Sequence, residues 1–105
     1  MLEITPKELK LWQDEGRDFF LLDVREPHER DIVSIGGELI PMGQFQDSLD
    51  RIPKDKPVVI YCRSGGRSAF VVQQLVNSHG YIEVYNLAGG VLQYSDDVDP
   101  DLPKY

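Results

Sequence analysis

This sequence has almost no cysteine and no long apolar segment, and both absences narrow its class. A single cysteine among 105 residues cannot form an internal disulfide, and no second thiol is present to resolve an adduct on the first. No stretch approaches the length of a membrane span, and the first residues lack the apolar core of a secretory signal. We therefore predict a cytoplasmic protein that does not bind membranes.

Basic residues are scarce as well. The chain has 11 lysines and arginines against 18 acidic residues, which leaves a net charge of −7. Such a charge opposes binding to nucleic acid, so an anionic ligand must be attracted by local positive charge. The only histidines, His28 and His79, lack the spacing of metal ligands. We predict no metal site and no cofactor.

Short apolar segments alternate with helical ones along the chain. Strands are predicted over residues 19–24, 38–41, 57–61 and 83–85, and helices over 6–15, 26–30, 44–51, 67–79 and 90–94. Thr5, Pro6 and Glu8 predict a capping box at the start of the first helix. Because parallel strands need crossover elements between them, we predict an α/β fold: a parallel sheet of about five short strands with helices on both faces.

Length and composition support one domain over residues 1–105. Hydrophobic residues make up 41% of the chain, enough for one core of ordinary size. Residues 96–105 are rich in aspartate and interrupted by prolines. We interpret them as a solvated acidic C-terminal tail.

The one cysteine, Cys62, lies where the predicted strand 57–61 gives way to the loop Arg63-Ser64-Gly65-Gly66-Arg67-Ser68. The two glycines permit a tight backbone turn. The helix that follows directs unpaired N–H groups and the positive end of its dipole at the loop. Together with Arg63 and Arg67, this environment should lower the pKa of the thiol, and the thiolate is the attacking form. We predict that Cys62 is a nucleophile and that its substrate is a small anion.

Two charged residues at the end of another strand are predicted to support this site. The carboxyl ends of parallel strands meet at one edge, so Asp23 and Arg25 should lie on the same rim as Cys62. Asp23 is interpreted as an acceptor for loop N–H groups rather than as a proton-transfer group. Arg25 either helps to attract anions or pairs with Asp23, Glu26 or Glu29.

Four short strings occur in an order and spacing that resemble rhodanese-like sulfurtransferases, and the resemblance spans nearly the whole chain. They are Leu21-Leu22-Asp23-Val24-Arg25-Glu26, Leu39-Ile40-Pro41, Val58-Val59-Ile60-Tyr61-Cys62-Arg63-Ser64-Gly65-Gly66-Arg67-Ser68 and Leu87-Ala88-Gly89-Gly90-Val91. The segment 89–100 is similar to the rhodanese domain fused to adenylyltransferases of molybdopterin and thiamine sulfur delivery.

The resemblance implies a reaction. Cys62 would accept a sulfane sulfur as a persulfide from thiosulfate or a similar small anionic donor, while the backbone from Arg63 to Ser68 cradles it. The sulfur would then pass to a thiophilic acceptor, namely a thiol, cyanide or a sulfur-carrier protein. Such a mechanism is two-step and nucleophilic.

Two other functions stay open. Cysteine phosphatases and the arsenate reductases built on the same logic place five residues between cysteine and arginine, whereas four separate Cys62 from Arg67. The shorter loop favours a cavity for one terminal sulfur over one for a tetrahedral oxyanion. A noncatalytic regulatory or sulfur-carrying module would usually lack the cysteine, although a carrier that serves a dedicated protein donor would have the same sequence.

Overall fold

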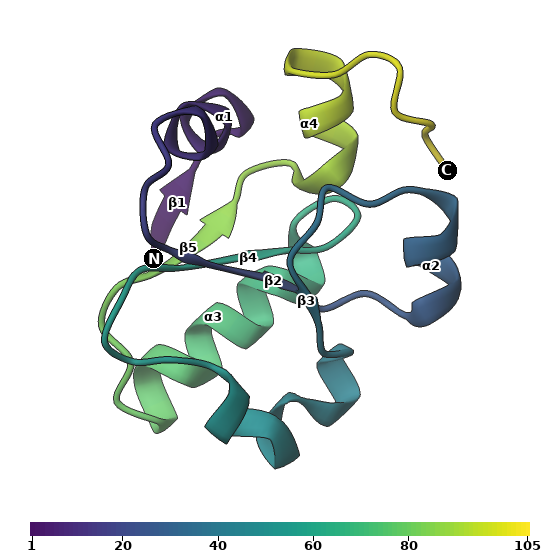
Figure 1. The fold of residues 1–105 in the computed structure, drawn as a ribbon. Helices are drawn as coiled ribbons and strands as arrows, with labels where there is room; N and C mark the ends of the chain where they lie inside the picture. Colours follow the sequence, from purple (N-terminus) through teal and green to yellow (C-terminus); the bar gives the residue numbers. More distant parts are fainter.

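The computed structural model describes residues 1–105, and its centre is a sheet of five parallel strands (Figure 1). They are β1 (Leu2–Ile4), β2 (Phe20–Asp23), β3 (Glu38–Leu39), β4 (Val58–Tyr61) and β5 (Val84–Leu87). Their order in the sheet is β1-β5-β4-β2-β3, which makes β4 the central strand. The predicted α/β fold with a parallel sheet is confirmed.

Helices cover both faces of the sheet. They are α1 (Pro6–Asp14), α2 (Pro27–Ile32), the 3-10 segment η1 (Met42–Arg51), α3 (Gly66–Ser78) and α4 (Gly90–Asp97). In Figure 1, α3 and η1 lie on one side of the sheet, while α1 and α4 lie together on the other. Of these helices, α1, η1 and α3 each connect one strand to the next along the chain and cover a face as they cross.

The central strand β4 contributes to two separate cores because its side chains alternate between the faces. Val58 and Ile60 pack with the apolar side of α3, and Val59 and Tyr61 pack with α1 and α4. Cys62 continues this alternation and belongs to the core on the α3 side. The alternation of side chains along β4 therefore directs Cys62 towards the face covered by α3.

The first helix begins as its sequence predicts. The hydroxyl of Thr5 accepts a hydrogen bond from the Glu8 N–H at 3.1 Å, and the Glu8 carboxylate accepts one from the Thr5 N–H at 2.9 Å. These two bonds form the predicted capping box, with Pro6 at the first helical position.

Other boundaries differ from the prediction. Strand β1 was not predicted, because three residues carry too little periodicity, and it forms by pairing with β5 at the sheet edge. The predicted helix 44–51 is a 3-10 segment interrupted at Ser48, where φ is −124° and ψ is 21°. Strand β5 runs two residues beyond the predicted end, and α4 continues to Asp97 rather than ending at Tyr94.

The segment predicted as a solvated tail folds back onto the domain. Its acidic side chains are wholly or partly exposed, but Val98, Leu102 and Tyr105 pack against the core formed by α1, α4 and the sheet. The Ser95 hydroxyl also donates to the Leu102 carbonyl at 2.8 Å. The apolar residues between the prolines and aspartates hold this segment in place.

Candidate active site

The Cys62 loop is a short connection that packs against a second glycine turn, Gly89-Gly90, at the start of α4. Strand β4 ends at Tyr61 and α3 begins at Gly66, with Gly65 in the left-handed region at a φ of 111°. The carbonyl of Cys62 accepts a hydrogen bond from the Val91 N–H at 3.0 Å. A Cβ on Gly90 would collide with the backbone carbonyls of Cys62 and Arg63, so only glycine allows α4 to approach this closely.

Hydrogen-bond donors surround the sulfur of Cys62. The Gly65 N–H lies 3.1 Å from Sγ, and the Ser68 N–H lies 3.4 Å from it. The Ser68 hydroxyl oxygen is 3.3 Å from Sγ. Cys62 is nevertheless only 1% exposed, so these groups hold the sulfur in a buried position.

These donors shift the ionisation of the thiol. Burial would raise the pKa of Cys62, but the Ser68 hydroxyl and the N–H groups of Ser68, Gly65 and Ser64 outweigh it and lower the pKa below its usual value. Arg63 and Arg67, predicted to share this role, make no hydrogen bond with the sulfur. Backbone and hydroxyl dipoles therefore favour the thiolate here.

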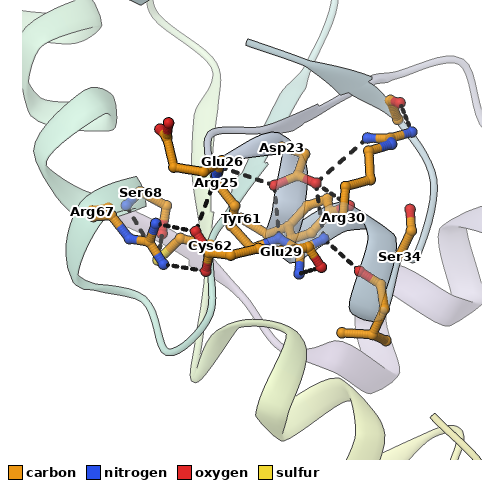
Figure 2. Close-up of polar contacts among 12 residues, drawn as sticks. Asp23, Arg25, Glu26, Glu29, Arg30, Ser34, Tyr61, Cys62, Arg67 and Ser68 are labelled. Carbon is orange, nitrogen blue, oxygen red and sulfur yellow. Dashed lines mark hydrogen bonds and ion pairs between the residues drawn. The ribbon is translucent and has the colours of Figure 1, made fainter. Parts of the chain in front are cut away.

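Arg67 is turned away from the sulfur and towards α2. Its two terminal nitrogens donate to the two carboxylate oxygens of Glu29 at 2.7 and 2.8 Å (Figure 2). Glu29 also accepts from the Glu26 N–H at 3.0 Å and the Tyr105 hydroxyl at 2.7 Å. The bonds from Arg67 are the main reason that the pKa of Glu29 lies well below its usual range, despite partial burial. Most of the positive charge of Arg67 is therefore balanced within the protein.

Asp23 and Arg25 form a second ion pair that is completely buried (Figure 2). Nε and Nη2 of Arg25 each donate to a different carboxylate oxygen of Asp23 at 2.9 Å. The Tyr61 hydroxyl lies 3.1 Å from the same carboxylate, and burial raises the pKa of this phenol to about 12. Both residues lie on the predicted rim, but Arg25 has no exposed surface with which to meet an anion.

Arg63 is the loop arginine that faces solvent. It is exposed, and its guanidinium carbon lies 5.0 Å from the centre of the Tyr105 ring. Of the predicted loop residues, Ser64 and Gly66 are exposed as well. The mouth of the loop thus presents one cation beside small residues.

Three residues at the site were not assigned a role from the sequence. Glu29 was considered only as a partner of Arg25, and nothing in the pattern near Tyr105 indicates that its side chain returns to the site. Asn86 contacts both Ser68 and Gly65 from β5. The sequence could have indicated a role for Asn86, because it is the only amide in an otherwise apolar strand and a buried amide needs hydrogen-bond partners.

One groove lies away from the Cys62 loop. This groove of about 340 Å³ lies between the start of β1 and α3, and no Cys62-loop residue lines it. No three histidine, cysteine or acidic side chains are grouped as metal ligands would be. None of the helices has the length and apolar character needed to cross a bilayer.

Comparison with known proteins agrees with this geometry. Residues 5–97 match the family described as the rhodanese-like domain. A protein from Staphylococcus aureus described as a rhodanese-like domain protein has the same fold, with a TM-score of 0.83 and 31% identity, covering 100% of this chain and 99% of that one. The chain belongs to the rhodanese-like domain family.

Two curated relatives carry names that refer to sulfur transfer. A protein named "Sulfurtransferase" from Allochromatium vinosum is 38% identical over 98 residues, covering 89% of this chain and 87% of its own length. The probable adenylyltransferase/sulfurtransferase MoeZ of Mycobacterium tuberculosis is 39% identical over 105 residues, covering 97% of this chain. This chain spans only 26% of MoeZ. The matches support membership of a sulfurtransferase family.

Proposed function

We propose that this protein transfers a sulfane sulfur from thiosulfate or a similar anionic donor to a thiophilic acceptor through a persulfide on Cys62. The observation that carries the proposal is the ring of donors around Sγ, with the Gly65 and Ser68 N–H groups at 3.1 and 3.4 Å. These groups favour the thiolate, which is the form that attacks sulfur.

The proposed reaction has two displacements. The Cys62 thiolate attacks the outer sulfur of thiosulfate, an S–S bond forms to Sγ, and the S–S bond of the donor breaks so that its electron pair leaves with sulfite. Cyanide or a thiolate, including a thiolate on a carrier protein, then attacks the outer sulfur. The pair of electrons in the Cys62 S–S bond returns to Sγ, which restores the thiolate. No external oxidant or reductant is needed for transfer to cyanide.

The donor must also reach a buried atom. Because Cys62 is 1% exposed, side chains or backbone at the mouth of the loop have to move before the outer sulfur of a donor meets Sγ. The exposed residues there are Arg63, Ser64 and Gly66, and Arg63 supplies the positive charge that would attract the anion. We propose that this part of the loop opens for the donor.

The orientation of Arg67 argues against a phosphatase or arsenate reductase. Those reactions need the loop arginine to bind the equatorial oxygens of an oxyanion, whereas both terminal nitrogens of Arg67 are bonded to Glu29. The four residues between Cys62 and Arg67 also make a shorter loop than the five of such enzymes. Sulfur transfer is the function that this geometry favours.

Intact-mass measurement tests the proposal directly. The purified protein is incubated with thiosulfate and weighed beside the Cys62→Ser variant, and a gain of one sulfur atom is expected in the parent alone. Hydrolysis of a phosphate ester without any sulfur uptake would instead favour the oxyanion chemistry. Sulfur uptake from a cysteine desulfurase but not from free thiosulfate would identify a carrier module with a dedicated protein donor.

A further inference from the structure

A buried amide lies directly beneath the Cys62 loop. Asn86 belongs to β5 and is 4% exposed, although its neighbours in that strand are mainly apolar. A buried amide without partners is unfavourable, so both of its ends need hydrogen bonds. Here both ends bond to the loop, since Nδ2 donates to the Gly65 carbonyl at 3.2 Å and Oδ1 accepts from the Ser68 hydroxyl at 2.5 Å.

The partners of Asn86 determine how its amide is oriented. The Gly65 carbonyl can only accept, so it must face the Nδ2 end, and Oδ1 must then face Ser68. A serine hydroxyl has one proton. Besides the sulfur, it has two acceptors within reach, the Gly65 carbonyl at 3.2 Å and Oδ1 of Asn86 at 2.5 Å, and the shorter distance favours Asn86. The Ser68 oxygen therefore presents a lone pair to Cys62 Sγ, 3.3 Å away, which suits a thiol that donates its S–H.

When Cys62 ionises, its sulfur needs a hydrogen-bond donor instead of an acceptor. A thiolate can only accept hydrogen bonds, so the Ser68 hydroxyl must turn from Asn86 to donate to the sulfur. That rotation leaves Oδ1 of Asn86 buried without a donor. Asn86 and the thiolate thus compete for the same proton.

We propose that Asn86 is a positioning residue that adjusts the reactivity of Cys62 by competing with the thiolate for the single hydroxyl proton of Ser68. The proposal deepens the proposed function and rests on it for the statement that the thiolate is the attacking species. Asn86 also fixes the Gly65 carbonyl and hence the left-handed turn that places the Gly65 N–H near Sγ. A single substitution of Asn86 changes both effects, so the test has to separate them.

A double-mutant cycle on Asn86 and Ser68 isolates the competition. Ionisation of Cys62 is followed by the ultraviolet absorbance of the thiolate against pH, in the parent, Ser68→Ala, Asn86→Ala and the double variant. The same titration of Cys62→Ser is subtracted because tyrosines also absorb as they ionise. Since Cys62 is the only cysteine and no donor is added, the result can be interpreted even if no persulfide ever forms.

The cycle has an expected direction. Ser68→Ala should raise the pKa of Cys62 in both backgrounds, because the hydroxyl favours the thiolate. We expect this effect on the ionisation constant to be about threefold to tenfold larger in the Asn86→Ala background, since Ser68 then gives up only its longer contact with the Gly65 carbonyl when it turns. An equal effect in both backgrounds, or a larger one in the parent, would overturn the proposal.

A second substitution keeps the test valid if Asn86→Ala does not fold. In Asn86→Asp a carboxylate accepts the Ser68 proton more strongly, so the effect of Ser68→Ala should be smaller than in the parent. An effect that is unchanged or larger would refute the competition. Asn77→Ala is the matched control, because Asn77 is an exposed asparagine of α3 and should leave the titration as it is.

Discussion

The loops after β2 and β4 leave the same edge of the sheet, yet they stabilise a negative charge in different ways. Asp23, at the end of β2, is balanced by the full positive charge of Arg25 at 2.9 Å. Cys62, after β4, is surrounded by two amide N–H groups and a hydroxyl group at 3.1 to 3.4 Å. The register pairs Asp23 with Tyr61, so Asp23 and Cys62 lie at the ends of neighbouring strands.

This difference separates the structural role of the Asp23–Arg25 pair from the chemical role proposed for Cys62. A buried carboxylate with a bidentate cation is stable only when both partners are present, so that pair fixes the shape of the rim. Neutral donors favour the thiolate with partial charges and leave its lone pairs available to attack. The following predictions remove one element of this contrast at a time.

Breaking the buried pair should have the largest effect on stability. Arg25→Ala leaves the Asp23 charge buried with the backbone N–H of residue 25, the Tyr61 hydroxyl and the partly exposed Arg30 as its remaining partners, and we expect a loss of about 3–5 kcal/mol. Urea unfolding gives the measurement. Lys10→Ala, which breaks an exposed pair with Asp14, is the control and should change stability far less. Similar losses in both variants would mean that the buried pair has no special structural role.

Breaking the pair of the buried Glu29 and the partly exposed Arg67 should have a smaller effect on stability, and that effect should depend on pH. We expect Glu29→Gln to lose about 1–3 kcal/mol at neutral pH, because charge-assisted hydrogen bonds weaken. The folded pKa of Glu29 lies below the usual 4.5, so its contribution is present above pH 4.5 and is lost as the pH falls towards the folded value.

Unfolding curves of parent and variant at a series of pH values test that dependence. The difference in unfolding free energy between the two should narrow as the pH falls below about 4.5. A difference that stays constant down to acid pH would show that the carboxylate charge is not the source of the stabilisation.

Removing the hydroxyl of Tyr105 should cost about 1 kcal/mol. In Tyr105→Phe the ring still lies beside Arg63, but the bonds with Glu29 and Arg25, at 2.7 and 3.0 Å, are lost. Thermal unfolding is the measurement. Tyr85→Phe is the matched control because that hydroxyl bonds only to Glu83 at an exposed position. If both variants melt alike, the contacts of Tyr105 do not hold the C-terminal segment to the rim.

Arg63→Ala should have the smallest effect on stability, about 0.5 kcal/mol or less. Because hydrogen bonds from Ser68, Gly65 and Ser64 lower the pKa of Cys62 and Arg63 makes none with the sulfur, the titration of the thiol should be unchanged. The rate of sulfur uptake from thiosulfate should fall, and the fall should diminish at high salt, since attraction of an anion at an exposed site is screened. A change in the pKa of Cys62 in Arg63→Ala would instead show that Arg63 lowers the pKa of the thiol, as predicted from the sequence.

Much of the site follows from local sequence. Cys62 lies between an apolar strand and a glycine loop, and this pattern predicts a nucleophilic sulfur that faces the start of a helix. The burial of that sulfur was not predicted. The capping box at Thr5 and Glu8 was predicted correctly for the same reason, since both partners are three residues apart. Contacts between near neighbours depend on backbone geometry that the residue types themselves prefer.

The partners that come from distant parts of the chain were not predictable in this way. Asn86 is 18 residues from Ser68, and Tyr105 is 76 residues from Glu29, so no periodicity links either pair. The orientation of Arg67 towards Glu29 also depends on where α2 packs against the rim.

The residue types and their order therefore specify the sulfur, its loop and the alternation of strands and helices, because these arise from local preferences. The direction of each charge and of the Ser68 proton depends on how the strands pair and the helices pack, because only that packing brings the distant partners within hydrogen-bonding distance.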